Sequence, residues 1–179
     1  MPGPSEPTQR STCEAVQRSR LSSGLLCAVD TGASFRPEAG PASAFVDTNI
    51  WVHAHLKVPG DPRHERALAL VQSGLPLVIS PQVVAEYYNV MLRNARADAW
   101  IQANLRAMFA RTRLQPANAE VLTTALELRN RHAFSFWDCQ IAAAALEAQC
   151  DVLLTEDMQH GQVLNQQLRV VNPLRDDAQ

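Results

Sequence analysis

The sequence predicts an α/β protein, a three-layer α/β/α sandwich with a central parallel sheet. Short apolar runs of strand length occur at 44–46, 76–80, 151–155 and 168–172. Segments with the apolar spacing of helices lie between these runs, and the chain contains no internal repeat. Short strands that alternate with helices predict a parallel sheet with helices on both of its faces.

The first half of the domain supplies two strands and two helices. The first strand, 44–46, consists of three apolar residues and ends abruptly at Asp47. A short helix is expected over 50–56, and a second helix begins at an Asp-Pro pair and covers 61–72. The apolar run 76–80 is then the second buried strand.

The second half is mainly helical until the last strands. Ser80 followed by Pro81 is a strong helix start, because a capping residue precedes proline at the first helical position. That helix is expected to continue to about Asn94. The remaining expected elements are helices over 98–111, 118–131 and 135–150, the last rich in alanine, and strands over 151–155 and 168–172.

Residues 1–42 differ in composition from the rest of the chain. They contain five prolines among many small polar residues and show no sustained periodicity. Such a segment buries too little apolar surface to offset the entropy of ordering. We therefore predict a flexible extension over 1–42, or a misplaced start, and one folded domain over 43–179.

The overall composition limits the class of protein and its partners. Hydrophobic residues make up 46% of the 179 residues and charged residues 19%, as in ordinary globular proteins. A net charge of −2 means that any contact with nucleic acid requires a local basic patch. The four cysteines have no metal-binding spacing, and no apolar run has the length of a membrane span. We predict a cytoplasmic protein.

Four carboxylates are expected at one edge of the sheet. In an open parallel sheet, residues just beyond the strands converge at the carboxyl edge. Asp47 follows the first strand, Glu86 lies in the second turn of the helix after the second strand, and Asp157 follows the strand 151–155. Asp138 lies in the first turn of a helix that an antiparallel return could bring to the same edge.

Three of these acids have ordinary structural explanations. Asp47 could begin a turn, and Asp157 could complement a helix dipole. Asp138 fits a capping box with Ser135, and alone this would be its better explanation. Glu86 is harder to explain structurally, because it borders an apolar stripe with no basic residue within a turn, and a carboxylate there needs a partner or a cation.

A cluster of carboxylates favours a particular chemistry. Repulsion within such a cluster raises its pKa values or captures a cation. A set of oxygen ligands without cysteine or an organised histidine group selects Mg²⁺ or Mn²⁺. Ions of this kind support phosphodiester hydrolysis, in which an activated water attacks in line and no side-chain nucleophile is needed.

The sequence resembles PIN-domain ribonucleases, and most closely the toxins of the VapC type from bacterial toxin–antitoxin pairs. The resemblance covers about 43–174, and related toxins begin almost at the first strand, without an extension of some forty residues. The motifs that carry it are "FVDTNI" with Asp47, "ISPQVVAEYYNVMLR" with Glu86, "FSFWDCQIAAAA" with Asp138 and "LLTEDMQHG" with Asp157.

This resemblance implies a Mg²⁺- or Mn²⁺-dependent endoribonuclease that forms a homodimer. It also implies inhibition by a small antitoxin whose C-terminal segment crosses the active site. Thr48, Asn49 and Thr155 would orient the acids or contact the substrate. Asp157 is the favoured fourth acid, although Glu156 is its neighbour and could serve instead.

Two other functions compete with this interpretation. Phosphotransferases that resemble the haloacid dehalogenase family need a second aspartate two residues after the first, and Asn49 occupies that position here. A catalytically inactive PIN-like module that binds RNA or protein is the second alternative, and the full set of acids argues against it.

The substrate side of the site is less defined by the sequence. Five arginines of the middle helices could form a patch that engages RNA phosphates, or could equally lie on a solvated face: Arg93, Arg96, Arg106, Arg111 and Arg113. The three tryptophans, Trp51, Trp100 and Trp137, are assigned to packing.

Overall fold

The structure is a computed structural model that describes residues 43–175. The extension expected over 1–42 lies outside the described residues. Within the described range, no helix is long and apolar enough to cross a membrane.

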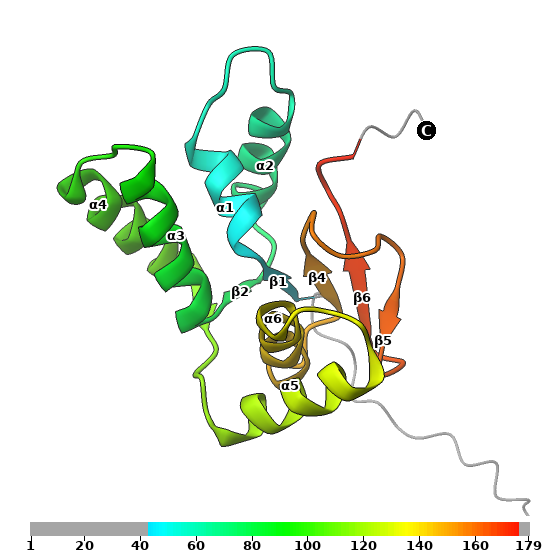
Figure 1. Ribbon diagram of the computed structural model, residues 1–179. Helices are drawn as coiled ribbons and strands as arrows, with labels where there is room; N and C mark the ends of the chain where they lie inside the picture. Colours follow the sequence, from blue (N-terminus) through cyan, green and yellow to red (C-terminus); the bar gives the residue numbers. More distant parts are fainter. Residues whose placement is uncertain (1–42, 176–179) are drawn as a thin grey trace, which may run out of the picture. The chain divides into compact units, whose positions relative to one another are not determined.

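A six-stranded sheet forms the centre of the described domain (Figure 1). The strand order is β3-β2-β1-β4-β6-β5, and each neighbouring pair is parallel except the last, β6 and β5. The strands are β1 (Ala44–Val46), β2 (Leu77–Ile79), β3 (Thr112–Leu114), β4 (Val152–Leu154), β5 (Val163–Leu164) and β6 (Leu168–Val171).

Helices cover both faces of this sheet, as the sequence predicted. The described residues form α1 (Thr48–His55), α2 (Arg63–Val71), α3 (Pro81–Arg93), α4 (Asp98–Phe109), α5 (Ala119–Arg131) and α6 (Phe136–Glu147). The chain steps from β1 to β2 to β3 and then returns past β1 to β4. Right-handed crossovers therefore place α1 to α4 on one face and the packed pair α5 and α6 on the other.

The sequence did not predict two short strands. β3 has the residues Thr112, Arg113 and Leu114, which carry a single apolar side chain, and it forms an edge of the sheet. β5 has only two residues and pairs antiparallel with β6. β3 depends on pairing with the distant strand β2, and β5 is too short for its two residues to give a strand signal of their own. The expected parallel sheet is confirmed, with this antiparallel edge added.

The strand order creates a switch point beside β1. The chain leaves β1 toward β2 on one side, whereas β4 pairs with β1 on the other side. In open α/β sheets, the crevice at the carboxyl ends of such strands is where ligands bind. The residues that follow β1 and β4 are Asp47 and Thr155, so both are placed at this crevice.

Helix α6 is buried along most of its length, which explains its alanines. It packs against α5 and β4, and the residues from Ile141 to Leu146 are all buried. Small side chains let the helix approach its neighbours closely, so little space remains for larger side chains.

We expect Ala143→Leu to lower the free energy of unfolding by roughly 1–3 kcal/mol, because Ala143 is fully buried and the added atoms overpack the core. Ala103→Leu on the exposed surface of α4 is the matched control, with an expected change within about 0.5 kcal/mol. Urea denaturation measures both. Equal stability of the two variants would contradict the packing described for α6.

Candidate active site

Asp47 is the most buried of the expected acids. It follows β1 directly, its side chain is 7% exposed, and it is the N-cap of α1. Its Oδ1 accepts a hydrogen bond from the backbone N–H of Thr48 at 2.6 Å. Its Oδ2 accepts from Thr155 Oγ1 at 2.7 Å and from Asn49 Nδ2 at 3.3 Å. Asp47 thus caps the helix, and its carboxylate also faces residues that follow β4.

Burial raises the pKa of Asp47 to about 6, and repulsion from the Asp157 and Glu86 carboxylates adds to this effect. The hydrogen bonds from Thr155 and Thr48 act in the opposite direction. Among the described residues, no arginine, lysine or histidine forms an ion pair with Asp47. At neutral pH the carboxylate is therefore mostly ionised, buried and uncompensated, and a bound cation would stabilise it.

Glu86 is held toward the same region from α3. Ser80 caps this helix and Pro81 begins it, as the sequence predicted. Thr48 Oγ1 donates a hydrogen bond to Glu86 Oε2 at 2.7 Å, and Gln82 Nε2 donates to Oε1 at 2.8 Å. Glu86 is therefore hydrogen-bonded to the first turn of α1 through the Thr48 hydroxyl.

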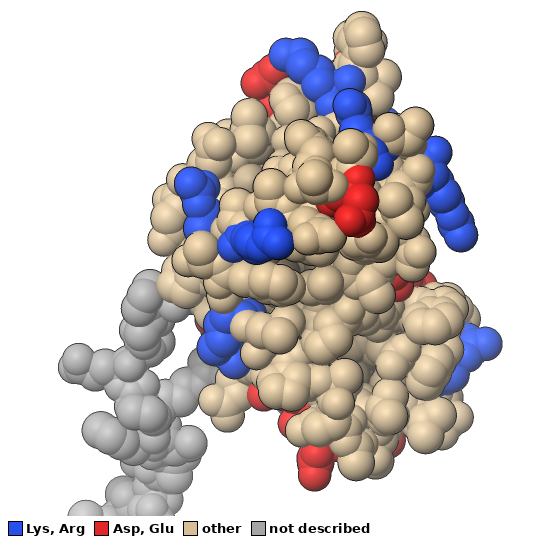
Figure 2. Space-filling view, turned by 90° about the vertical axis from the view of Figure 1, so that its left-hand side faces the viewer, with Lys and Arg blue, Asp and Glu red and all other residues tan. Residues whose placement is uncertain are grey.

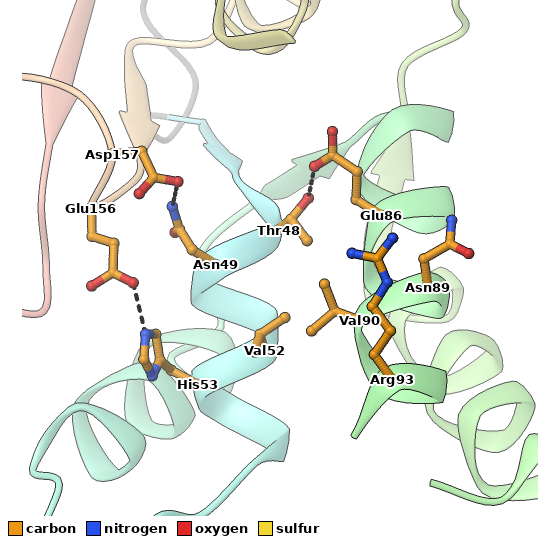
Figure 3. A pocket seen from close by; sticks show the side chains of 10 residues that line it. All are labelled: Thr48, Asn49, Val52, His53, Glu86, Asn89, Val90, Arg93, Glu156 and Asp157. Carbon is orange, nitrogen blue, oxygen red and sulfur yellow. Dashed lines mark hydrogen bonds and ion pairs between the residues drawn. The ribbon is translucent and has the colours of Figure 1, made fainter. Parts of the chain in front are cut away.

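Asp157 is connected to the site from the other side of α1. Asn49 Nδ2 donates a hydrogen bond to Asp157 Oδ2 at 2.9 Å. The backbone N–H of Asp157 donates to Thr155 Oγ1, which itself donates to Asp47. Figure 3 shows Asn49 directed toward Asp157 and Thr48 directed toward Glu86, with the start of α1 between them.

Glu156 differs from its neighbour Asp157 because it contacts a histidine and an arginine. Its Oε1 lies 2.7 Å from His53 Nε2, and its Oε2 lies 3.2 Å from Arg63 Nη1. Arg63 is itself held by Asp61. In the part of the chain that the structure describes, Asp157 has no ion pair. Asp157 is therefore the better candidate for a cation ligand of the two.

Asp138 forms the capping box that the sequence suggested. Its Oδ2 accepts from the backbone N–H of Ser135 at 3.3 Å and from Ser135 Oγ at 2.8 Å, and its own N–H donates to that hydroxyl. Gln82 Nε2 donates to the carbonyl of Trp137 at 3.2 Å as well as to Glu86, so the first turn of α6 lies beside α3. The Asp138 carboxylate itself does not line the pocket.

An open pocket of about 520 Å³ lies against these residues (Figure 3). Helices α1 and α3 form its walls, together with the two acids that follow β4. Its lining residues are Thr48, Asn49, Val52, His53, Glu86, Asn89, Val90, Arg93, Glu156 and Asp157.

The donor atoms suit a hard cation, although the side chains do not form a finished metal cage. Among the described residues, no three acidic, histidine or cysteine side chains stand close enough together to hold an ion by themselves. Hydroxyl and amide groups lie between the carboxylates. Asn49 Oδ1 is buried without a hydrogen-bond partner, so it adds an unsatisfied oxygen to this set. Carboxylate, hydroxyl and amide oxygens are the ligands that Mg²⁺ and Mn²⁺ prefer.

The sequence interpretation missed several residues of the site. Gln82 lies four residues before Glu86, a helical spacing at which side chains meet, and this spacing was a usable signal. The contacts of Glu156 with His53 and Arg63 join residues 103 and 93 positions apart, so no local signal announces them.

The packing role predicted for the tryptophans needs correction, whereas the sequence leaves the five arginines open between an RNA-binding patch and a solvated face. Trp51 is buried as predicted, whereas Trp137 is 63% exposed and is not a packing residue. Among the five arginines, Arg93 lines the pocket, whereas Arg113 donates to the carbonyl of Ala148. Figure 2 shows the basic residues in several separate groups over one face, some of them beside acidic residues, so they do not form a continuous stripe.

The chain belongs to the PIN domain family, because the family model matches residues 44–163. A solved structure similar to it is the sarcin-ricin loop cleaving toxin VapC20 of Mycobacterium tuberculosis, with 25% identity and a TM-score of 0.52, covering 62% of this chain and 86% of that one. This confirms the predicted resemblance. No curated protein matches the sequence.

More distant structures share the fold. A toxin–antitoxin complex from Klebsiella pneumoniae is 17% identical with a TM-score of 0.56, and FitAcB from Neisseria gonorrhoeae is 18% identical with a TM-score of 0.50. Each match covers 73% of this chain and 97% of the other. At this level of identity the matches show the fold alone.

We expect Asp47→Asn to stabilise the metal-free protein at pH 7.5 by roughly 1–3 kcal/mol. The folded-state pKa of Asp47 lies above its usual value of 3.8, so ionisation opposes folding as the pH rises through about 6. The gain should fall to near zero at about pH 4, where the parent carboxyl is also protonated. Denaturation in the presence of a chelator at both pH values measures it.

The exposed Glu127→Gln is the control for removal of a carboxylate, since Glu127 forms a surface ion pair with Arg131. Its effect should stay within about 0.5 kcal/mol at both pH values. A loss of stability in Asp47→Asn that is larger at pH 7.5 than at pH 4 would contradict the burial effect.

Proposed function

We propose that this PIN-domain protein is a Mg²⁺- or Mn²⁺-dependent endoribonuclease and the toxin of a toxin–antitoxin pair, acting in the cytoplasm. One observation carries the proposal. The buried and uncompensated Asp47 lies at the carboxyl end of β1, with Glu86 and Asp157 linked to it through the first turn of α1. The VapC20 structure, described as a toxin that cleaves the sarcin-ricin loop, supports the reaction class.

Four acids are the proposed ion-holding residues: Asp47, Glu86, Asp138 and Asp157. A divalent ion held there would polarise the scissile phosphate and lower the pKa of an attacking water. Asp138 contributes through Oδ1, because both of its capping hydrogen bonds use Oδ2.

Three polar residues position these acids. Thr48 directs Glu86, and Thr155 directs Asp47 by donating its hydroxyl proton. Asn49 contacts Asp47 and Asp157 with one amide group, which fixes the separation of the two carboxylates. Such orientation keeps the charged groups in place before the substrate arrives.

The α3 wall of the pocket suits the RNA backbone. Arg93 and Asn89 lie on α3, and Figure 3 shows the Arg93 guanidinium directed toward the Glu86 end of the pocket. A cation that faces a group of acids offsets repulsion between those acids and a phosphate. We assign Arg93 to a phosphate next to the scissile bond.

Protein partners belong to the same proposal. The similarity to VapC20, which is described as a toxin, supports an antitoxin that blocks the pocket. We also propose a homodimer. An apolar groove of about 400 Å³ between α3, α4 and β3, lined by Val84, Tyr88, Phe109 and Leu114 among others, supports an interface with a second copy.

The alternative is a PIN-like module that binds RNA without cleaving it. It would keep the acids in place but have no requirement for a divalent ion. Turnover therefore separates the two functions.

We expect Asp47→Asn and Asp157→Asn to reduce RNA cleavage by at least about 100-fold while the fold is retained. Glu156→Gln is the matched control, because Glu156 is already engaged by His53 and Arg63, and it should keep most of the activity. Cleavage of a labelled single-stranded RNA with Mg²⁺ or Mn²⁺ is the measurement. Parent-level activity in Asp47→Asn would overturn the assignment.

A thermal shift tests ion binding in the parent and in variants of Asp47 and Glu86. An ion at 100 times its dissociation constant should stabilise the parent by roughly 2.7 kcal/mol. This gain should be lost in Asp47→Asn and reduced in Glu86→Gln. Cleavage that persists with a chelator would refute the metal requirement.

We expect Arg93→Ala to weaken RNA binding and to reduce the slope of log affinity against log salt by about 0.7, the value for one phosphate of a single strand. Arg93→Lys should keep the slope because it keeps the charge. Arg106→Ala is the control, since Arg106 contacts Gln102 on α4 and does not line the pocket. An unchanged slope in Arg93→Ala would exclude the phosphate contact.

A further inference from the structure

Trp137 is the most exposed of the large hydrophobic side chains in the described range, at 63%. It lies in the first turn of α6, between Phe136, which is also exposed, and Asp138. The Phe136 ring lies 6.5 Å from it, centroid to centroid, at an interplanar angle of 60°, so the two rings are not stacked on each other. The fold therefore leaves a wide aromatic surface in solvent, where an apolar side chain gains nothing for stability.

The backbone of Trp137 lies beside the proposed active site. Gln82 donates one hydrogen bond to the Trp137 carbonyl at 3.2 Å and another to Glu86 at 2.8 Å. Glu86 in turn accepts from Thr48, next to Asp47. One glutamine side chain thus joins the backbone of Trp137 to an acid of the site, so the first turn of α6, which carries the indole, is held next to that acid.

We propose that Trp137 stacks on an unpaired RNA base next to the scissile phosphate. The inference rests on the proposed function, and it specifies that the substrate is single-stranded at this position. A strand that places one phosphate at the acids continues beyond the pocket, and its neighbouring bases need a surface. Aromatic side chains provide that surface for unpaired bases, whereas both faces of a base in a duplex are already covered.

The charge distribution favours RNA bases over a phosphate or an acidic segment as the partner. Two carboxylates are associated with this turn: Asp138 is the next residue, and Glu86 shares the Gln82 donor with the Trp137 carbonyl. An uncharged base ring avoids the repulsion that an anionic group would meet there. Stacking also tolerates any of the four bases, so Trp137 would contribute affinity and strand position more than sequence selection.

The test combines variants of the protein with variants of the RNA. Asp47→Asn serves as the binding background, so that RNA remains intact during the measurement. The probe is a single-stranded RNA oligonucleotide, together with copies that each carry one abasic nucleotide at a successive position. Trp137→Ala in this background should weaken binding about tenfold, which corresponds to about 1.4 kcal/mol.

The decisive result is coupling between the protein and one position of the strand. With Trp137 present, the strand that is abasic at one position near the cleaved bond should bind about tenfold more weakly than the intact strand. With Trp137→Ala, the same abasic strand should bind as well as the intact strand. Trp137→Phe should retain most of the binding, whereas Trp137→Leu, which keeps apolar area without an aromatic face, should not. Leu126→Ala, which removes another exposed apolar side chain on α5, is the control and should leave binding unchanged.

Other outcomes overturn the inference. Equal binding of all abasic strands by both proteins would exclude stacking, and so would full binding by Trp137→Leu. A change in oligomeric state or in antitoxin binding, with RNA binding unchanged, would make Trp137 a protein contact instead. A parent protein that binds RNA with this coupling but never cleaves it would refute the proposed function and leave the stacking assignment standing.

Discussion

The ionised carboxylate of Asp47, buried at the carboxyl end of β1, is the constraint on which the site depends. Desolvation raises its pKa to about 6, and no basic side chain of the described residues compensates its charge. Hydrogen bonds from Thr48 and Thr155 reduce this energy without removing it. Serine and asparagine cap helices as well as aspartate does, and neither buries a charge. The buried charge of Asp47 therefore supports the cation site proposed above.

The first turn of α1 connects two other acids, Glu86 and Asp157, to Asp47. Thr48 contacts Glu86 on one side of this turn, and Asn49 contacts Asp157 on the other. These contacts join segments that are 38 and 108 residues apart in the chain, and the switch in strand order beside β1 brings them together. Short polar side chains therefore set the distances between carboxylates that would otherwise repel one another.

Neighbouring residues have different tasks because their partners differ. Glu156 contacts His53 and Arg63, so it ties α1 and α2 to the loop after β4. Asp157, one residue later, lines the pocket. A similar division appears at α6, where one oxygen of Asp138 caps the helix. In each case a structural contact and a proposed ion ligand occupy adjacent atoms or residues, which makes sequence patterns ambiguous at the site.

The sequence by itself determined the class of fold, most element positions and the candidate acids, because apolar periodicity and the Ser80-Pro81 helix start are local properties of the chain. It also predicted the capping role of Asp138 from a pattern of four residues. Only the tertiary structure decided the edge strand β3, the pairing of Glu156 and the exposure of Trp137. These features depend on which distant residues become neighbours, and spacing along the chain carries no information about a contact between residues some hundred positions apart.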